Sequence, residues 1–398
     1  MLGQNEWKKL GRWANIWWSQ FRFLTMKNNR PVNQTADDVI VIKMDAIGDF
    51  LIWLDSASQY KKIYKNQRIV LICNTVCEEI AKHTGFFDEI ISVQSRRFEA
   101  DNKYKKEILE KLRKRSFHTL LQTAYSRIID MDILACCIPA KEKIGFVADE
   151  SRENLSRFVT FRWICKKLDK IYDKLIPSGE KGLMELERNA VFIRGLGREF
   201  KAGYSELPIA QVKEGIIPQK PYVVFFPGSS SEKKMWPIDR FAQIGEYIIS
   251  KKNMDIYLCG SKDEAYIYEN FMNSMKRNEY KERVHNYFGK TTLLELAEVI
   301  RHSELIISND TSGIHFAAAV NTKGICLFGE FAFGRFLPYR CERDCKEHNP
   351  IIVCHAGMQC AGCSAKGTRT SACKEHLMKA GKYLCIDEIT VEQVLEWI

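Results

Sequence analysis

The stretch VIVIKMDAIGDFLIWL, residues 39–54, joins a predicted buried strand to the start of a predicted helix. The apolar run 39–42 indicates a strand, the chain turns through Lys43 and Gly48, and apolar residues then recur with helical spacing. Asp49 stands where the helix begins. Because a helix N-terminus favours a negative charge, capping explains this acid as readily as chemistry does.

The same alternation of strand and helix extends over most of the chain. Strands are predicted at 39–43, 68–73, 88–93, 117–122 and 143–146, and again at 221–226, 254–259, 304–308 and 323–328. Helices are predicted near 48–64, 75–84, 101–114, 127–136, 183–198, 237–252, 263–277, 292–301 and 312–320. Such alternation favours parallel sheets with helices on both faces. We therefore expect an α/β protein with two doubly wound domains in tandem.

A chain of 398 residues is longer than a single hydrophobic core usually accommodates, which favours two domains. The expected organisation is a basic Trp-rich segment at 1–36, a first domain at 37–200, a linker at 201–220, a second domain at 221–340, and a Cys-rich tail with a C-terminal helix at 341–398.

Composition narrows the class of protein. The chain has 60 basic and 50 acidic residues, a net charge of +10, which suits a phosphorylated ligand or an anionic membrane surface. The excess is too mild to indicate nucleic-acid binding. No apolar run predicts a transmembrane helix, and the N-terminus lacks the apolar core of a secretory signal. We expect a cytoplasmic protein whose thiols stay reduced unless a metal holds them.

The segment NEWKKLGRWANIWWSQFRFL, residues 5–24, predicts a helix with one aromatic and apolar face and basic residues between. Two interpretations remain open. A basic helix of this kind is typical of an anchor on the membrane surface. It is equally typical of a helix packed on its own protein or on a sister subunit.

Three further stretches follow predicted strands, at the edge where ligands of open α/β sheets collect. FPGSSSEKKMWP (226–237) offers Ser229, Ser230 and Lys234 to a phosphate, although a solvated loop explains it too. LCGSKDE (258–264) offers Asp263 or Glu264 to a ribose diol, with helix capping as the alternative.

The third stretch, SNDTSGIH (308–315), begins another predicted helix. Its candidates for a ligand are Asp310, Thr311, Ser312, Gly313 and His315. A capping box without a ligand is the alternative for the first three residues, and packing is the alternative for the histidine. If the histidine faces a cleft, it can donate to a phosphate or to a sugar hydroxyl.

Three blocks together resemble glycosyltransferase family 9, the ADP-heptose:lipopolysaccharide heptosyltransferases. They are VIVIKMDAIGDFL, FFPGSSSEKKMWPIDRFAQIGEYI and LIISNDTSGIHFAAAVNTKGICLFG, in the family's order and spacing. The resemblance covers the chain from about residue 37 to its end. Three features depart from it. Many relatives read D-T-G-x-x-H where this chain reads D-T-S-G-I-H, and FGEFAFGRFLPYR (328–340) is outside the shared core, as is the N-terminal segment.

The resemblance implies a GT-B fold, two Rossmann-like domains facing across a cleft, and transfer with inversion at the anomeric carbon. The N-terminal domain would bind the acceptor. Asp49 matches the family's catalytic base, Gly48 would leave room for the acceptor, and Lys43 would meet an anionic acceptor. The C-terminal domain would bind the nucleotide-sugar.

For the donor, the resemblance assigns Lys234 to the diphosphate, with help from Thr311, Ser312 and the helix amides. Asp310 would orient that loop, and Glu264, with Asp263 as its rival, would bind the ribose. Because cations and a helix end can stabilise the leaving group, no cofactor is required for catalysis.

Seven of the 14 cysteines lie in the last 58 residues. Cys360, Cys363, Cys373 and Cys385 have the spacing of a structural zinc or iron site. Some family members carry a similar set, and a four-cysteine metal finger occurs in a protein-modifying branch. Free thiols, or disulfides formed on isolation, are the alternatives.

The function predicted from these features is inverting transfer of a heptose from ADP-heptose, or of a related sugar, to a lipopolysaccharide or cell-surface glycan. The alternatives are a heptosyltransferase acting on protein and a catalytically silent nucleotide-sugar-binding or assembly protein. A metal-finger nucleic-acid binder is disfavoured, since only Lys366, Arg369 and Lys374 accompany the cysteines.

Overall fold

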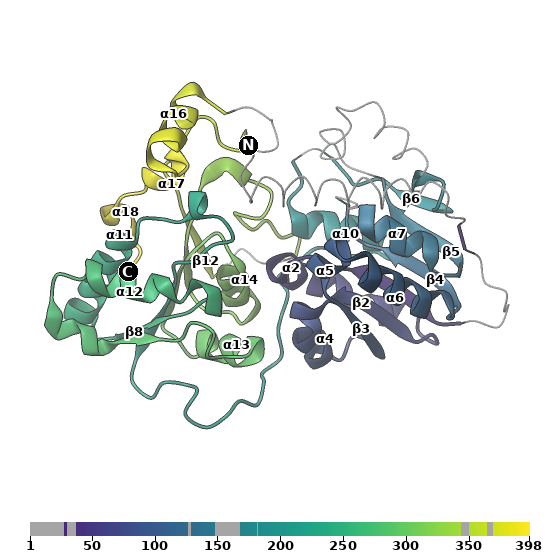
Figure 1. Cartoon of the computed structure of the whole chain (residues 1–398), viewed down its shortest axis with the longest axis horizontal. Coiled ribbons are helices and arrows are strands. Elements are labelled where there is room, and N and C mark those ends of the chain that lie inside the picture. Colours follow the sequence, from purple (N-terminus) through teal and green to yellow (C-terminus); the bar gives the residue numbers. More distant parts are fainter. Residues whose placement is uncertain are drawn as a thin grey trace. The chain divides into compact units, whose positions relative to one another are not determined.

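The computed structural model describes residues 28–29, 37–125, 129–147, 168–180, 182–343, 350–363 and 369–398. The predicted helix at 5–24 lies outside them. The chain forms two compact units, each built on one parallel sheet with helices around it (Figure 1). Unit 1 comprises Met1–Phe50, Ser56–Glu180 and Arg188–Phe200, and unit 2 comprises Leu51–Asp55, Lys181–Glu187 and Lys201–Ile398.

The sheet of unit 1 has the strand order β3-β2-β1-β4-β5-β6, with every neighbouring pair parallel. Its strands are β1 (Val39–Lys43), β2 (Ile69–Asn74), β3 (Glu89–Val93), β4 (Phe117–Gln122), β5 (Ala140–Phe146) and β6 (Lys174–Ile176). The helices along this part of the chain are α2 (Ile47–Ala57), α3 (Tyr60–Ile63), α4 (Glu78–Thr84), α5 (Ser95–Ala100), α6 (Asn102–Arg113), α7 (Ile129–Cys137) and α10 (Glu185–Gly195).

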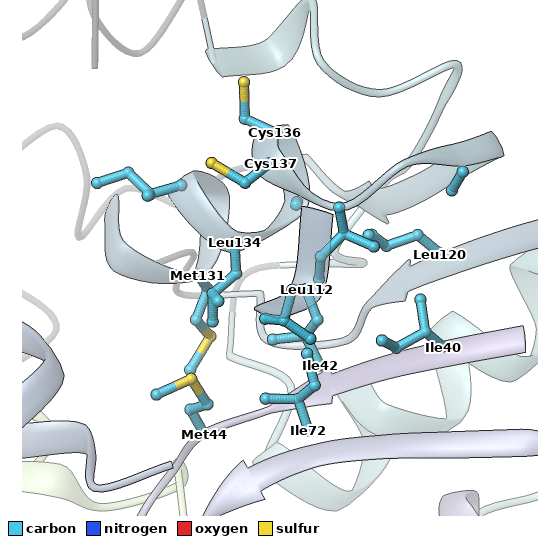
Figure 2. Packing of buried hydrophobic residues seen from close by; sticks show 14 of the residues in the cluster. Ile40, Ile42, Met44, Ile72, Leu112, Leu120, Met131, Leu134, Cys136 and Cys137 are labelled. Atoms are coloured by element: carbon cyan, nitrogen blue, oxygen red, sulfur yellow. The ribbon is translucent and has the colours of Figure 1, made fainter. Parts of the chain in front are cut away.

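The core of unit 1 explains why its strands are continuous apolar runs. All five residues of β1 are buried, because helices cover both faces of a parallel sheet. Ile40 and Ile42 of β1 lie in one cluster with Leu112 of α6 and Leu134 of α7 (Figure 2). Burial of each such side chain contributes roughly 1.5–3 kcal/mol, so this cluster fixes the central strand and the loop that follows it.

The sheet of unit 2 has the order β12-β11-β10-β7-β8-β9 and is also parallel throughout. Its strands are β7 (Tyr222–Phe226), β8 (Asp255–Leu258), β9 (Val284–Asn286), β10 (Leu305–Asn309), β11 (Gly324–Leu327) and β12 (Ile351–Cys354). Its helices are α11 (Ile238–Tyr247), α12 (Tyr266–Ser274), α13 (Leu293–Arg301), α14 (Ser312–Ala319), α16 (Ser371–Ala380), α17 (Leu384–Asp387) and α18 (Val391–Leu395). Three short 3₁₀ turns matter below: η2 (Glu232–Lys234), η4 (Lys262–Glu264) and η6 (Glu330–Ala332).

The two sheets have the same topology. In each, the first strand is central, the next two strands lie on one side of it, and the last three lie on the other. The direction of winding therefore reverses between β1 and β4, and between β7 and β10. Ligands of open α/β sheets bind beyond the carboxyl ends of the strands at such reversals. Each unit thus has one favoured position for a site.

All nine predicted strands and the predicted α/β class are confirmed. The predicted helix at 48–64 is divided into α2 and α3. The strands β6, β9 and β12 were not predicted. The first two have three residues each, too few to show a period in the sequence. The division at 37–200, 201–220 and 221–340 stays a prediction.

Candidate functional site

The best-defined candidate site lies in unit 2, at the reversal between β7 and β10. These strands are neighbours, with Phe226 paired to Ser308 near their carboxyl ends. The loop 227–234 leaves β7 here, and the loop 310–311 leads from β10 into α14. Two of the three stretches singled out in the sequence are therefore brought together by strand pairing.

One buried side chain joins the two loops. Asn309 ends β10 and is fully buried. Its Nδ2 donates to the carbonyl oxygen of Pro227 at 2.6 Å, and its Oδ1 accepts from the backbone N–H of Trp236 at 3.1 Å. The Trp236 indole in turn donates to the carbonyl oxygen of Ile389 at 2.9 Å. Both ends of the segment that carries Ser229, Ser230 and Lys234, which we call the Ser/Lys loop, are thereby fixed to β10.

One hydroxyl and one helix N-terminus at these loops are open to a ligand. The hydroxyl of Ser229 is buried and has no hydrogen-bond partner among the residues that the structure describes. Thr311 is the N-cap of α14, yet its side chain makes no capping hydrogen bond and lies 3.3 Å from the hydroxyl of Ser308. A helix N-terminus with unsatisfied amides favours an anion. Ser312 and Asp310 are half-buried beside it, and Ser230 is exposed.

Gly313 has a packing role. A Cβ atom at this position would come within 2.7 Å of the Phe226 ring, closer than real Cβ contacts. The first turn of α14 can therefore lie against β7 only with glycine here. This explains the place of glycine in D-T-S-G-I-H: it stands where α14 crosses the phenylalanine.

Of the two acids considered for a ribose, Glu264 is the one next to the β7 loop. A Cβ atom on Gly228 would lie 2.2 Å from its Oε1. Its Oε2 accepts from the Ser261 N–H at 2.8 Å and from the Ser261 hydroxyl at 2.7 Å. Capping thus occupies one carboxylate oxygen and leaves the other against the loop. Asp263 is exposed on η4.

Lys234 ends the turn η2 and is half-buried. Its ammonium lies 4.4 Å from the centroid of the Phe331 ring. The face of an aromatic ring attracts a cation, so this contact limits where the ammonium can go. Phe331 belongs to the 328–340 segment that departs from the family pattern.

His315 lies inside unit 2 rather than on its surface. It is 5% exposed, and its Nδ1 is 2.5 Å from the hydroxyl of Tyr339. Burial lowers the pKa of His315 to about 4, so the imidazole is neutral near pH 7. A neutral histidine does not supply charge to a phosphate. It can orient a hydroxyl through hydrogen bonds.

In unit 1, the predicted acceptor residues gather at the end of β1. Lys43 is 1% exposed and forms a 2.7 Å ion pair with Asp45. Gly48 and Asp49 lie half-buried in the first turn of α2. The electrostatic surroundings of Cys77 include both Asp45 and Asp49, together with Lys43. The end of β1 is therefore a concentrated group of charges.

Neighbouring strands contribute to this end of the sheet. Ser95, at the start of α5 after β3, donates its hydroxyl to the Met44 carbonyl at 3.2 Å. Thr123, directly after β4, donates its hydroxyl to the Ile42 carbonyl at 3.2 Å. The end of β1 and the loop that leads into α2 are thereby tied to the elements beside them. Asp49 belongs to unit 1 and Lys234 to unit 2.

The four tail cysteines line one pocket of unit 2, together with Phe331 and Tyr383; they are Cys360, Cys363, Cys373 and Cys385. All four are free thiols, and burial raises the pKa of Cys385 to about 11. Across the described parts of the chain, no three or more Cys, His, Asp or Glu side chains form an arrangement that could hold a metal ion. The four predicted ligands therefore line one pocket, but their described positions do not have the geometry of a metal site.

Comparison with known proteins agrees with this arrangement. Residues 189–366 match the profile of Glycosyltransferase family 9 (heptosyltransferase). Lipopolysaccharide core heptosyltransferase OpsX of Haemophilus influenzae is 28% identical over 239 residues, which cover 58% of this chain and 62% of that relative. This part of the chain is similar to glycosyltransferase family 9. The curated relatives are matched over 29% to 62% of their own length.

Solved structures that resemble this chain show its fold. Escherichia coli ADP-heptose lipopolysaccharide heptosyltransferase II has a TM-score of 0.62 and 15% identity, over 90% of this chain and 96% of that one. The iron-containing dodecameric glycosyltransferase TibC from enterotoxigenic E. coli has a TM-score of 0.54 and 12% identity, over 91% and 78%. At these identities the likeness shows the fold, which is GT-B. Within the described ranges, no helix has the length and apolarity to cross a bilayer.

Sequence reasoning missed Asn309, Tyr339 and Phe331. Asn309 stood inside the family block as part of N-D-T, but its role was visible only once Pro227, 82 residues earlier, lay beside it. Phe331 and Tyr339 lie in the divergent segment 328–340, where no motif marks them. The signal that was available is the aromatic content of FGEFAFGRFLPYR.

Proposed function

We propose that this chain is an inverting glycosyltransferase that moves a heptose from ADP-heptose to a lipopolysaccharide or cell-surface glycan. The observation that carries the proposal is the β7–β10 site. There Asn309 joins two loops, the buried hydroxyl of Ser229 has no hydrogen-bond partner among the described residues, and Thr311 makes no capping hydrogen bond to α14. A diphosphate would supply acceptor oxygens to the Ser229 hydroxyl and to the first amides of α14.

The donor is proposed to bind unit 2. Its diphosphate would accept from Ser229, from Thr311 and Ser312, and from the first amides of α14, with Lys234 providing the positive charge. Glu264 would accept hydrogen bonds from the ribose through the oxygen that faces Gly228. His315, which is neutral, is proposed to orient a sugar hydroxyl.

The reaction is proposed to proceed in one displacement. Asp49 takes the proton of the acceptor hydroxyl while that oxygen attacks the anomeric carbon. The new carbon–oxygen bond forms on the face opposite the nucleotide, which inverts the configuration. The bond to the diphosphate breaks at the same time, and its electron pair leaves with ADP. Lys234 and the α14 amides stabilise the charge that builds up there.

The acceptor side is proposed to lie at the end of β1. Asp49 stands in the first turn of a helix whose preceding loop is hydrogen-bonded to adjacent elements. Gly48 leaves the acceptor room beside it. The ion pair between buried Lys43 and Asp45 would define the polarity next to the acceptor. We further propose that residues 5–24 hold the protein at the inner face of the membrane.

The four-cysteine pocket is proposed to hold a structural zinc or iron ion. The support is that four thiols, a ligand type that zinc and iron accept, line one space. TibC, which is similar in fold, is an iron-containing glycosyltransferase. Thiolates bound to the ion would cross-link the loop-rich tail. No catalytic step depends on the ion. Metal analysis of the purified, reduced protein tests this: about one equivalent per chain is expected, and none with all four cysteines changed to serine.

Thermal unfolding with a panel of nucleotides tests the proposed function. ADP and ADP-heptose are expected to raise the melting temperature, since a ligand that binds only the folded state stabilises it. GDP and UDP serve as controls. Release of ADP in the presence of a glycan acceptor would support transfer. Stabilisation by ADP-heptose without turnover on any glycan or protein acceptor would instead support a silent binding protein.

A further inference from the structure

The turn that carries Lys234 is held by the cysteine lobe, which we define as η6 together with residues 358–363 and 369–387. The turn has little structure of its own. It is a single 3₁₀ turn of three residues without a side-chain cap. Short 3₁₀ turns have poor hydrogen-bond geometry, so they need support from neighbours.

The lobe supports the backbone on both sides of Lys234. The carbonyl oxygen of Lys233 accepts from the N–H of Tyr383 at 3.0 Å. The carbonyl oxygen of Met235 accepts from the ammonium of Lys382 at 3.0 Å. Two consecutive residues of the lobe thus hold the carbonyl groups of the two residues on either side of Lys234.

The lobe also contacts the side chain. The Phe331 ring lies 4.4 Å from the Lys234 ammonium and 5.4 Å from the ring of Tyr383. The guanidinium carbon of Arg369 lies 4.8 Å from the centroid of the Tyr383 ring. The same guanidinium donates to the Tyr383 hydroxyl at 3.1 Å. The backbone N–H groups of Glu330 and Phe331 donate to the thiol of Cys385. These contacts make one packed unit of the ring, the tyrosine and the thiol.

We infer that Phe331 and Tyr383 are positioning residues that hold Lys234 in place for the diphosphate. The inference rests on the proposed function, in which Lys234 binds that group. A free lysine side chain has about 2 kcal/mol of rotamer entropy, much of which a ligand must otherwise remove. A ring on one side of the ammonium leaves its remaining N–H donors available to phosphate oxygens.

A double-mutant cycle with ADP as the ligand tests the inference. Phe331→Leu removes the ring face and keeps an apolar side chain. The expected result is a Kd for ADP about three- to tenfold weaker by calorimetry, the range of a partly exposed cation–π contact. Phe331→Tyr retains a ring face and is expected to bind like the parent protein. Tyr280→Leu is the control, since it removes a similar contact with Arg277 at 5.4 Å.

The decisive comparison is made in the Lys234→Ala background. There Phe331→Leu is expected to cause no further loss, because the ring acts through the ammonium. An equal loss in both backgrounds would overturn the inference. If Lys234→Ala itself leaves ADP binding unchanged, the proposed phosphate role of Lys234 fails instead, so the two failures are distinguishable.

A second measurement does not depend on a ligand. The rate at which an amine reagent labels Lys234, followed by mass spectrometry, is expected to rise about fivefold in Phe331→Leu and to stay unchanged in Phe331→Tyr. Phe331→Met replaces the leucine variant if that variant does not fold. Equal labelling in the parent, methionine and tyrosine proteins would show that the ring does not position Lys234.

Discussion

Asn309 holds the carbonyl oxygen of Pro227 at 2.6 Å, across 82 residues of sequence. The same side chain accepts from Trp236, so one amide closes the whole Ser/Lys loop. The two loops of the candidate donor site therefore form a single hydrogen-bonded structure.

Asn309→Ala is expected to destabilise the protein. The change leaves a buried carbonyl and a buried N–H unsatisfied, which costs about 2–4 kcal/mol. Urea unfolding followed by tryptophan fluorescence measures the loss, and Asn270→Ala, at an exposed position of α12, is the control. A loss no greater than that of the control would show that the two hydrogen bonds are dispensable.

Asp49→Asn is expected to abolish transfer while ADP binding stays within about twofold. The amide retains the shape of the side chain but cannot take a proton, and general-base catalysis contributes about 10²–10⁴ in rate. Release of ADP and calorimetry of ADP binding are measured on the same preparation. Activity near that of the parent protein would remove Asp49 as the base.

Lys234→Ala is expected to weaken ADP binding about tenfold or more, since hydrogen bonds to charged groups contribute about 1.5–3 kcal/mol. Lys233→Ala is a matched control, because the neighbouring side chain is exposed and its backbone contact to Tyr383 is retained. The difference should shrink at high salt. Equal affinities for the two variants would exclude a specific role for Lys234.

His315 is expected to make the protein less stable as the pH falls. Its pKa is 6.5 unperturbed and about 4 when folded, so the unfolded chain binds the proton more tightly. The stabilisation is complete above pH 6.5 and is lost as the pH falls toward 4. The slope attributable to this group reaches about 1.4 kcal/mol per pH unit.

The free energy of unfolding of His315→Asn, measured between pH 7 and about pH 4, should lack this slope. His302→Asn is the control, because the side chain of His302 is 48% exposed. If the parent protein and His315→Asn lose stability in parallel, the histidine is not held neutral by burial.

The sequence predicted the parts of the fold that burial controls. The strand 39–43 was placed to the residue, because a strand covered on both faces must be apolar throughout. The strand β12 was missed, since IIVC stands in the Cys-rich tail and becomes a strand only by pairing with β11. Strand pairing at an edge is decided by tertiary contacts, which a local pattern does not record.

The sequence predicted the motif residues of the candidate site but not their tertiary partners. Gly313 and Glu264 were placed near ligands by motif, and the structure gives each a structural contact as well. Lys43 was expected to meet an acceptor, whereas its ion pair with Asp45 became visible only once β1 was buried. Partners such as Phe331 come from segments without a motif, so the sequence could not name them.

The contact of Gly313 with Phe226 has an evolutionary consequence. The space between α14 and β7 accommodates one ring or one side chain at the helix, but not both. Among homologues, the residue types at these two positions should therefore vary together, with a larger residue on the helix accompanied by a smaller one on the strand. An alignment that matches only the D-T letters would pair the glycine of D-T-G-x-x-H in relatives with Ser312 of this chain. The paired change at the helix and strand positions would instead show which helix residue packs against β7.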